Sequence, residues 1–285
     1  MNYTYSNTEK IFNENEYVLS NGEIFPYLSF EALDKYEDIS NLFSTRMGGV
    51  SKNEFSTLNL SFTRGDDEEA VLTNYKRVCE ALNSNVDCIV TSDQTHTTNI
   101  RVVTKADAGK GITVPRDYQD IDGLITNERG LILSTFYADC VPLYFYDPVN
   151  KAIGLSHSGW RGTVQMMGKK TIEAMNKNYG TIASDVIACI GPSICRECYE
   201  ISDDVAGEFK DAFGTVSESF LTQNRPEHFM LDLWKANEEV FLLAGIKKEN
   251  IHTTNICTCC NDKLLFSHRA TKGKRGNLGA FFMLK

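Results

Sequence analysis

The spacing of apolar residues predicts four helices. Residues 66–82 begin with four acidic side chains and then place apolar residues on one face, as expected for an amphipathic helix with a favourable N-terminal charge. Gly245 follows an amphipathic stretch and is a typical residue just past a helix end. Three further helices are predicted. Periodicity predicts helices over 163–178 and 231–244, and a helix that ends at Phe213 would be capped by Asp203 or Asp204.

Short apolar runs between turn residues predict strands. Asn21-Gly22 separates two such runs, so residues 1–30 are expected to form a hairpin appended to the rest of the chain. Two strands are expected within 131–146, one on each side of 138–140. Other strands are expected at 88–90, 100–103, 152–157, 186–190 and 280–284. The strands outnumber the helices and their order is irregular. This favours an α+β fold of layered mixed sheets flanked by helices, in one domain over 1–285.

Composition narrows the function classes. Hydrophobic residues make up 42% and charged residues 24% of the 285, which is typical of a folded globular chain. A membrane helix needs about 18 apolar residues in a row, and we expect no such segment and no secretory signal. The net charge of −9 argues against binding to nucleic acid or an anionic membrane, although a basic pocket for a small anion is compatible with it. The oligomeric state is left open.

The nine cysteines are an odd number, so at least one thiol is unpaired within a monomer. Without an export signal, we expect a cytoplasmic protein whose thiols are free or metal-bound. Two clusters stand out, Cys195-Arg196-Glu197-Cys198 and Cys257-Thr258-Cys259-Cys260. Together they could bind a structural metal. A redox disulfide is the second interpretation, and small packing residues are the interpretation that the pattern favours.

His96, Cys140 and His157 are the candidate metal ligands. Each lies at a strand end or in a loop beside small or polar residues. Two imidazoles and one thiolate form a three-ligand set, which leaves a fourth position for water on zinc. Spacing alone does not distinguish this site from a buried cysteine with two hydrogen-bonded histidines.

Two arginines are candidates for binding phosphate. Arg161 follows Trp160 just before the predicted helix, where unpaired N–H groups and a guanidinium fork together favour an anion. Arg46 precedes Gly48-Gly49 in another loop and could act in the same way. The alternatives are structural salt bridges for both arginines and core packing for Trp160.

Several motifs together resemble those of a known family, the YfiH-like proteins, once called laccase-domain proteins or polyphenol oxidases. The most specific are Ala138-Asp139-Cys140 and His157-Ser158-Gly159-Trp160-Arg161-Gly162. The resemblance covers roughly residues 40–280 in family order. Its other motifs lie at 43–51, 57–60, 65–67, 93–96, 190–194, 198–200 and 267–269, with Gly273 and Arg275.

This resemblance implies that His96, Cys140 and His157 bind zinc. It also implies phosphorolysis of adenosine, inosine, guanosine and S-methyl-5′-thioadenosine, and deamination of adenosine, so that a nucleoside and phosphate are the expected partners. The implied fold is shared with the catalytic domain of cytotoxic necrotizing factor. Many family members have Ser-Tyr-Arg-Arg where this chain has Ser267-His268-Arg269-Ala270. The second arginine is missing, and Lys272, Lys274 and Arg275 are candidates to replace it.

Deamination also requires a proton carrier. The usual zinc nucleobase deaminases have His-x-Glu, but here His96 is followed by Thr97-Thr98. Asp139 is our candidate because it adjoins Cys140, and the alternative is that it only orients a ligand. Cys140, His157 and Asp139 are thus the predicted catalytic residues.

Three rival functions stay open. A metal-free hydrolase would use Cys140 as nucleophile and His157 as base, and some bacterial family members are linked to peptidoglycan editing. A copper-dependent polyphenol oxidase is conceivable because two histidines and a cysteine also bind blue copper. However, five histidines are too few for a conventional multicopper oxidase. A non-enzymatic partner protein is the third rival.

Overall fold

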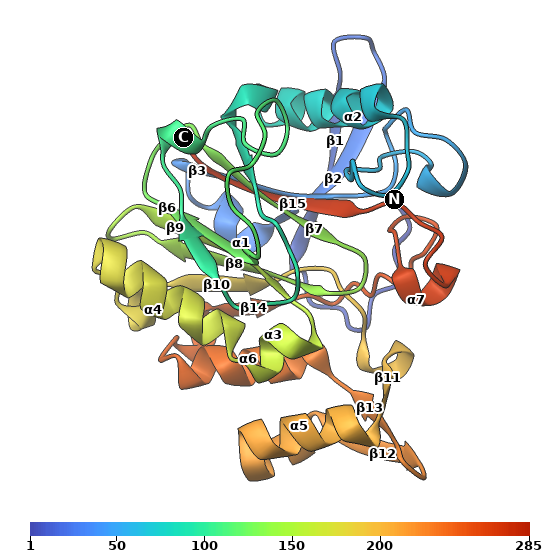
Figure 1. Ribbon diagram of the computed structural model, residues 1–285, viewed down its shortest axis with the longest axis vertical. Helices are drawn as coiled ribbons and strands as arrows, with labels where there is room; N and C mark the ends of the chain where they lie inside the picture. Colours follow the sequence, from blue (N-terminus) through green and yellow to red (C-terminus); the bar gives the residue numbers. More distant parts are fainter.

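Three β-sheets organise the chain, and the computed structural model describes all of residues 1–285 (Figure 1). The first sheet has the order β1 (Phe12–Val18), β2 (Ile24–Phe30), β3 (Ile39–Ser44), β15 (Leu278–Leu284), β7 (Ile132–Tyr137), β4 (Ile89–Thr91). The second has the order β14 (Ile251–Thr253), β10 (Ile187–Ile190), β8 (Val141–Asp147), β9 (Ala152–Ser158), β6 (Gly123–Thr126), β5 (Ile100–Val102). The third, smaller sheet has the order β11 (Glu200–Ser202), β13 (His228–Leu231), β12 (Leu221–Arg225).

Helices cover the outer faces of the two large sheets, as Figure 1 shows from top to bottom. Helix α2 (Glu68–Ala81) packs on the first sheet, and α4 (Met167–Tyr179) and α6 (Leu233–Leu243) pack on the second. The remaining helices are α1 (Glu31–Asp34), α3 (Trp160–Val164), α5 (Asp203–Phe213) on the small sheet, and α7 (His268–Thr271). No helix has the length and apolar character required to cross a bilayer.

A core of 26 buried residues lies between the two large sheets. Phe43 and Phe282 of the first sheet meet Tyr144 and Leu155 of the second in one cluster of buried residues. The Tyr144 hydroxyl donates to the Leu42 carbonyl at 3.0 Å, which satisfies a polar group that burial would otherwise leave unpaired. All seven residues of β8 are buried, because both faces of this strand are covered. The predicted layered α+β class is therefore confirmed.

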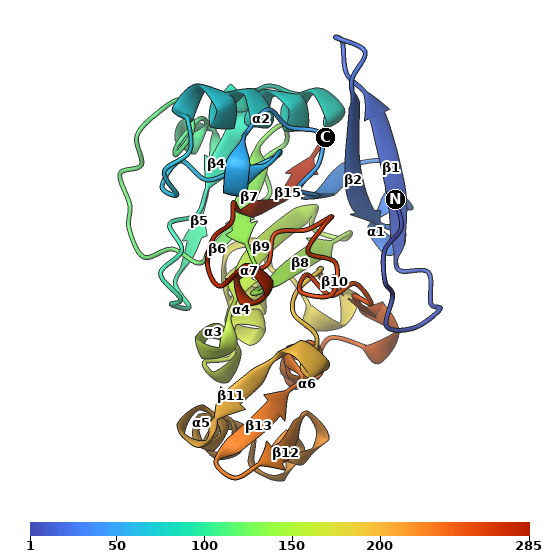
Figure 2. The ribbon, with the colours of Figure 1, turned by 90° about the vertical axis from the view of Figure 1, so that its right-hand side faces the viewer.

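Some local predictions need correction. The N-terminal hairpin forms from β1 and β2, but β2 also pairs with β3, so the hairpin is the edge of the first sheet rather than an appendage (Figure 2). The helix expected over 163–178 is divided into α3 and α4, because Met166 adopts a left-handed conformation with φ of 63°. The N-cap position of helix α5 is Ser202, whose side chain makes no capping hydrogen bond, and the expected caps Asp203 and Asp204 both lie in the first turn.

The segment 138–140 crosses from one sheet to the other. The sequence predicts a strand on each side of it, and these are β7 and β8, which belong to different large sheets. Asp139 takes a φ of 92°, an uncommon left-handed conformation for a residue other than glycine. The chain thus turns sharply at this crossing, and Cys140 lies directly before β8, where the chain enters the second large sheet.

Two helical glycines allow a matched test of helix packing. In Gly207→Ala the new methyl group meets nothing within 4 Å, so better helix propensity should raise the free energy of unfolding by about 0.5–1 kcal/mol. In Gly168→Ala it would meet Cε1 of the buried Phe241 ring at 2.7 Å, and such overpacking costs about 1–3 kcal/mol. Urea unfolding should therefore show opposite signs for the two variants. Equal stabilisation of both would contradict the packing of α4 against α6.

Candidate metal centre and active site

Strand register brings two of the three candidate ligands together. β8 and β9 are antiparallel, with Val141 opposite Ser158 and Pro142 opposite His157, so Cys140 lies beside the end of β9. His96 comes from the loop after β4. Its Nε2 lies 3.9 Å from the Cys140 Sγ, and the ligand atoms of all three side chains lie within 4.8 Å of one another.

The carboxylate of Asp122 holds both histidines. It is fully buried, and its Oδ1 accepts a hydrogen bond from Nδ1 of His157 at 2.7 Å. It also accepts from the backbone N–H groups of Thr95, His96 and Thr97 at 3.1, 3.2 and 2.8 Å. With Nδ1 so engaged, Nε2 of His157 is free to face Cys140, as is usual for a metal-binding histidine oriented by a carboxylate.

The surrounding space suits a metal ion. A Cβ at Gly159 would lie 3.1 Å from both the Cys140 Sγ and the His96 Cδ2, so a side chain at this position would crowd two of the three candidate ligands. His157 is buried, Cys140 is half-buried and His96 is exposed, which leaves the solvent side open for a fourth ligand. Imidazole and thiolate donors suit zinc or copper, and the residues therefore fit a three-ligand centre.

The charges of Cys140 and His157 stabilise each other. Burial opposes the thiolate, but His157 and His96 outweigh it and lower the pKa of Cys140 to about 6. Burial likewise opposes the imidazolium, but Cys140 and Asp122 raise the pKa of His157 to about 9. Burial also disfavours ionised Asp122, yet hydrogen bonds from His157 and the backbone keep its pKa below the ordinary value. The site thus supplies a ready thiolate.

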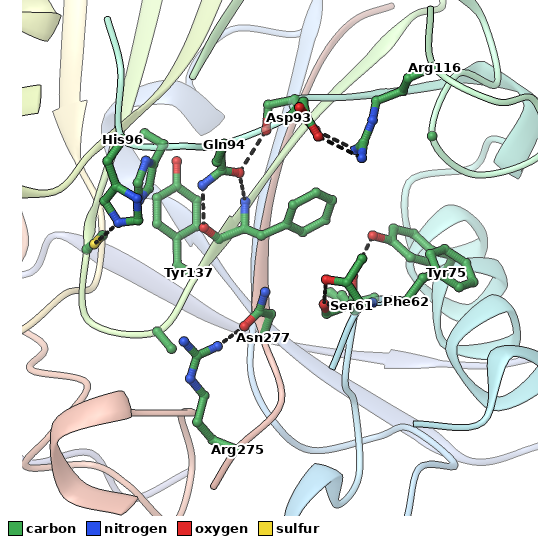
Figure 3. Close-up of a pocket in the computed structure, with 18 residues that line it drawn as sticks. Ser61, Phe62, Tyr75, Asp93, Gln94, His96, Arg116, Tyr137, Arg275 and Asn277 are labelled. Atoms are coloured by element: carbon green, nitrogen blue, oxygen red, sulfur yellow. Dashed lines mark hydrogen bonds and ion pairs between the residues drawn. The ribbon is translucent and has the colours of Figure 1, made fainter. Parts of the chain in front are cut away.

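Two hollows meet at His96 and Cys140. The larger has a volume of about 290 Å³, close to the lower end of small-molecule sites. Figure 3 shows His96 and Tyr137 at one end of it, Tyr75 and Arg116 at the other, and Arg275 with Asn277 along one side. The smaller has a volume of about 90 Å³ and is lined by residues that include Asp139, Trp160, Arg161 and Tyr199.

Arg275 lacks a carboxylate partner in the larger hollow. Its Nη1 donates to the Asn277 Oδ1, and its buried Nε has no hydrogen-bond partner. Burial and the nearby Arg64 lower the pKa of Arg275 to about 10, as expected for an uncompensated cation. In contrast, Arg116 forms a 2.8 Å ion pair with Asp93. Arg275 is therefore the cation in this hollow with free capacity for an anion.

The predicted phosphate-binding arginines differ in position. Arg161 lines the smaller hollow and stacks over the Trp160 ring at 4.3 Å. Arg46 lines neither hollow. Its guanidinium donates to the backbone carbonyls of Ser56 and Asp262 at 3.0 and 2.7 Å. These bonds join two loops, and a role of Arg46 in binding phosphate stays a prediction.

Asp139 lies beside the centre, but its carboxylate is already engaged. Oδ1 accepts from the Thr258 hydroxyl and Oδ2 from the Arg269 backbone N–H, both at 2.7 Å. These bonds tie the crossing segment to the C-terminal loops. Each oxygen still has a second lone pair, so this geometry is compatible with a structural role and with proton transfer.

Asp122, which orients His157, is not among the site residues that the sequence predicts. It adjoins Gly123, where β6 begins, and an acidic residue directly before an apolar strand is a signal that could have identified it. Its partners could not be predicted, because the loop with His96 is distant in sequence and reaches Asp122 only in the folded chain.

The chain is similar to several known proteins over most of its length. Residues 40–285 match the family described as multi-copper polyphenol oxidoreductase laccase. Purine nucleoside phosphorylase YlmD of Bacillus subtilis is 34% identical over 85% of this chain and 87% of its own length. Adenosine deaminase RL5, from an unknown prokaryotic organism, is 30% identical over 85% and 94%. The crystal structure of YlmD from Geobacillus stearothermophilus superposes with a TM-score of 0.88, at 31% identity, over 97% of this chain and 100% of that one.

Asp122→Asn should lower both the free energy of unfolding and the affinity of the candidate centre for zinc. An amide keeps the shape but loses the charge-assisted hydrogen bonds, each worth about 1.5–3 kcal/mol, and loss of such an orienting partner typically costs roughly 10–100-fold in metal affinity. Urea unfolding with a chelator present measures the first effect, and zinc competition with a coloured chelator measures the second. Asp120→Asn is the matched control, because this exposed carboxylate accepts one hydrogen bond, from the Thr95 hydroxyl at 2.7 Å, and none from a histidine ring or a backbone N–H. Equal effects in both variants would refute the role of Asp122.

Proposed function

Because the chain belongs to the multi-copper polyphenol oxidoreductase laccase family, the YfiH-like family that its motifs resemble, we propose that it is a zinc-dependent purine nucleoside enzyme. Its reactions would be phosphorolysis of adenosine, inosine, guanosine and S-methyl-5′-thioadenosine, and deamination of adenosine. The names of relatives at 34% and 30% identity support both activities. One observation carries the proposal: the His96, Cys140 and His157 set opens into a hollow that also holds an uncompensated arginine.

Zinc would be held by Nε2 of His96, Sγ of Cys140 and Nε2 of His157. The convergence of these atoms within 4.8 Å and the space left by Gly159 support this assignment. When bound, zinc supplies a Lewis acid that polarises a substrate oxygen or lowers the pKa of water. The buried Asp122 would keep His157 in the required tautomer.

The larger hollow would bind the nucleoside. Phe62 and Phe136 line it and are half-buried, so their exposed surface is available for contact with the flat face of a purine. Arg275 would bind phosphate on the same side, because its guanidinium has no carboxylate partner. This arrangement would bring the anion to the ribose while the base remains enclosed.

Phosphorolysis then depends on positioning and charge. A phosphate oxygen forms a bond to C1′ of the ribose while the bond from C1′ to the purine nitrogen breaks, and the electron pair leaves with the base. Arg275 would offset the charge of the attacking phosphate and hold it in line. Arg161, in the adjoining smaller hollow, would be a second cation near the same ligands.

Deamination needs a group that moves a proton from water to the departing amine. Asp139 is the proposed carrier, because it lies in the smaller hollow beside His96 and Cys140. The alternative is that Asp139 only anchors Thr258 and Arg269, which its two 2.7 Å hydrogen bonds also support.

A Cys–His hydrolase is the second candidate function. The 2.7 Å contact of Asp122 with His157 and the position of Cys140 resemble a Cys–His–Asp arrangement of nucleophile, base and orienting acid. The position of His96 argues against a hydrolase, because a Cys–His hydrolase does not require a second imidazole 3.9 Å from its nucleophilic sulfur. Stoichiometric zinc in the native protein would favour the nucleoside enzyme.

Phosphate dependence tests the main activity. Inosine should be cleaved only with phosphate present and should yield hypoxanthine and a ribose phosphate, both measured by chromatography. Arg275→Ala should raise the KM for phosphate roughly 10-fold or more, because a lost charged contact is worth about 1.5–3 kcal/mol. Lys274→Ala removes an exposed cation from the same loop and should leave that KM unchanged. Free ribose as the sugar product would instead indicate a hydrolase.

Asp139→Asn separates the two roles of this residue. Loss of a proton carrier should lower adenosine deamination about 10²–10⁴-fold at unchanged zinc content. Loss of an anchor should instead lower zinc affinity, and excess zinc should restore the rate. Both quantities are to be measured on one preparation. Restoration by zinc would remove Asp139 as the proton carrier.

A further inference from the structure

A second group of cysteines converges outside the active site. The turns Cys195–Cys198 and Cys257–Cys260 are far apart in sequence, yet the four terminal sulfur atoms lie within 4.8 Å of one another. The Sγ of Cys260 lies 3.5 Å from that of Cys198 and 4.0 Å from that of Cys195. Four sulfur atoms bound at about 2.3 Å around zinc are separated by roughly 3.8 Å, so the group already has the size of a tetrahedral site.

Both turns have the backbone geometry of a metal-binding loop. In the first, the Cys198 N–H donates to the Cys195 carbonyl at 3.2 Å. In the second, the Cys260 N–H donates to the Cys257 Sγ at 3.4 Å, and the Cys195 N–H donates to the same sulfur at 3.2 Å. Two N–H donors on one sulfur favour its thiolate form, which is the form that binds a metal.

The two turns are also fixed relative to each other. Ser193 and Cys257 form a parallel bridge, and the Thr258 N–H donates to the Ser193 carbonyl at 3.1 Å. These backbone contacts therefore hold the two cysteine-containing turns next to each other. Its burial is graded, with Cys195 and Cys257 buried, Cys198 half-buried and Cys260 exposed. A metal could reach it from solvent.

Packing alone does not explain this arrangement. An exposed Cys260 gains little as a small hydrophobic residue, and packing does not require four sulfur atoms to face one point. All nine cysteines are free thiols in the structure. An all-sulfur tetrahedral set is typical of a structural zinc site.

We propose that Cys195, Cys198, Cys257 and Cys260 bind a structural zinc ion. This site is distinct from the centre at Cys140 and does not depend on the proposed nucleoside chemistry. The first turn leads directly into β11 of the small sheet, which lies at one end of the molecule (Figure 2). The second carries Thr258, whose hydroxyl donates to Asp139. The zinc would fasten the small sheet and the loop that anchors Asp139 to the body of the protein.

Zinc stoichiometry tests the proposal on the full chain, purified under reducing conditions. Metal analysis should find two zinc ions per chain in the wild type and one in Cys260→Ser, with a lower melting temperature for the variant. Cys259→Ser is the matched control, because Cys259 belongs to the same turn but not to the convergent set. It should retain two zinc ions. Equal zinc content in wild type and Cys260→Ser, or iron in place of zinc, would overturn the proposal.

X-ray absorption spectroscopy of Cys140→Ala tests the proposal even if Cys260→Ser does not fold. The Cys140→Ala variant leaves all four cysteines of the proposed site in place. The remaining zinc should show a shell of sulfur alone at about 2.3 Å, without the nitrogen shell at about 2.0–2.1 Å that histidines give. Absence of zinc from this variant, nitrogen in the shell, or a disulfide among the four cysteines found by mass spectrometry would refute the site. If the site at His96, Cys140 and His157 binds no zinc, the wild type would contain one zinc ion and give the same sulfur-only signal. This result distinguishes failure of the site at His96 from failure of the four-cysteine site.

Discussion

One buried carboxylate holds the residues of the candidate site together. Asp122 accepts hydrogen bonds from the imidazole of His157, at the end of β9, and from three successive backbone N–H groups of the loop with His96. A fully buried charge is costly unless such donors surround it, so the loop and the strand end are coupled through a single residue. His96 itself adopts a φ of 66°, an uncommon left-handed conformation for a residue other than glycine, and such a conformation persists only where surrounding contacts hold it.

The crossing segment adds the third ligand and connects the active site to the C-terminal loops. Cys140 is presented where the chain passes from the first large sheet to the second, and its neighbour Asp139 is anchored by Thr258 and Arg269. Thr258 lies within the second C-x-x-C turn. A zinc ion on the four cysteines would therefore stabilise, through Thr258 and Asp139, the turn that presents Cys140. The two proposed centres would differ in chemistry, since three ligands would leave a position open and four cysteines would close the other site with sulfur.

Much of this architecture could be predicted from local patterns. The apolar stripe of α2, the hairpin turn at Asn21-Gly22 and the apolar run of β8 are local signals, and the structure contains all three elements. The sheet to which each strand belongs was not predictable, because pairings such as β3 with β15 join the two ends of the chain. The contacts of Asp122 and of Arg46 were not predictable for the same reason. In both cases a distant backbone segment determines what the side chain contacts.

The family name suggests copper oxidation, but the donor atoms argue for other chemistry. Copper clusters in oxidases require many imidazoles. Here only two of the five histidines belong to either group of converging ligands, and the second group contains sulfur alone. A redox-inactive metal suits four neighbouring thiols better than copper(II), which oxidises thiols. The ligands alone do not identify a nucleoside enzyme, because the same set could serve several hydrolytic reactions. What favours the proposed nucleoside chemistry is the adjoining hollow, where Arg275 has no carboxylate partner and would bind an anion next to aromatic side chains that would contact a purine.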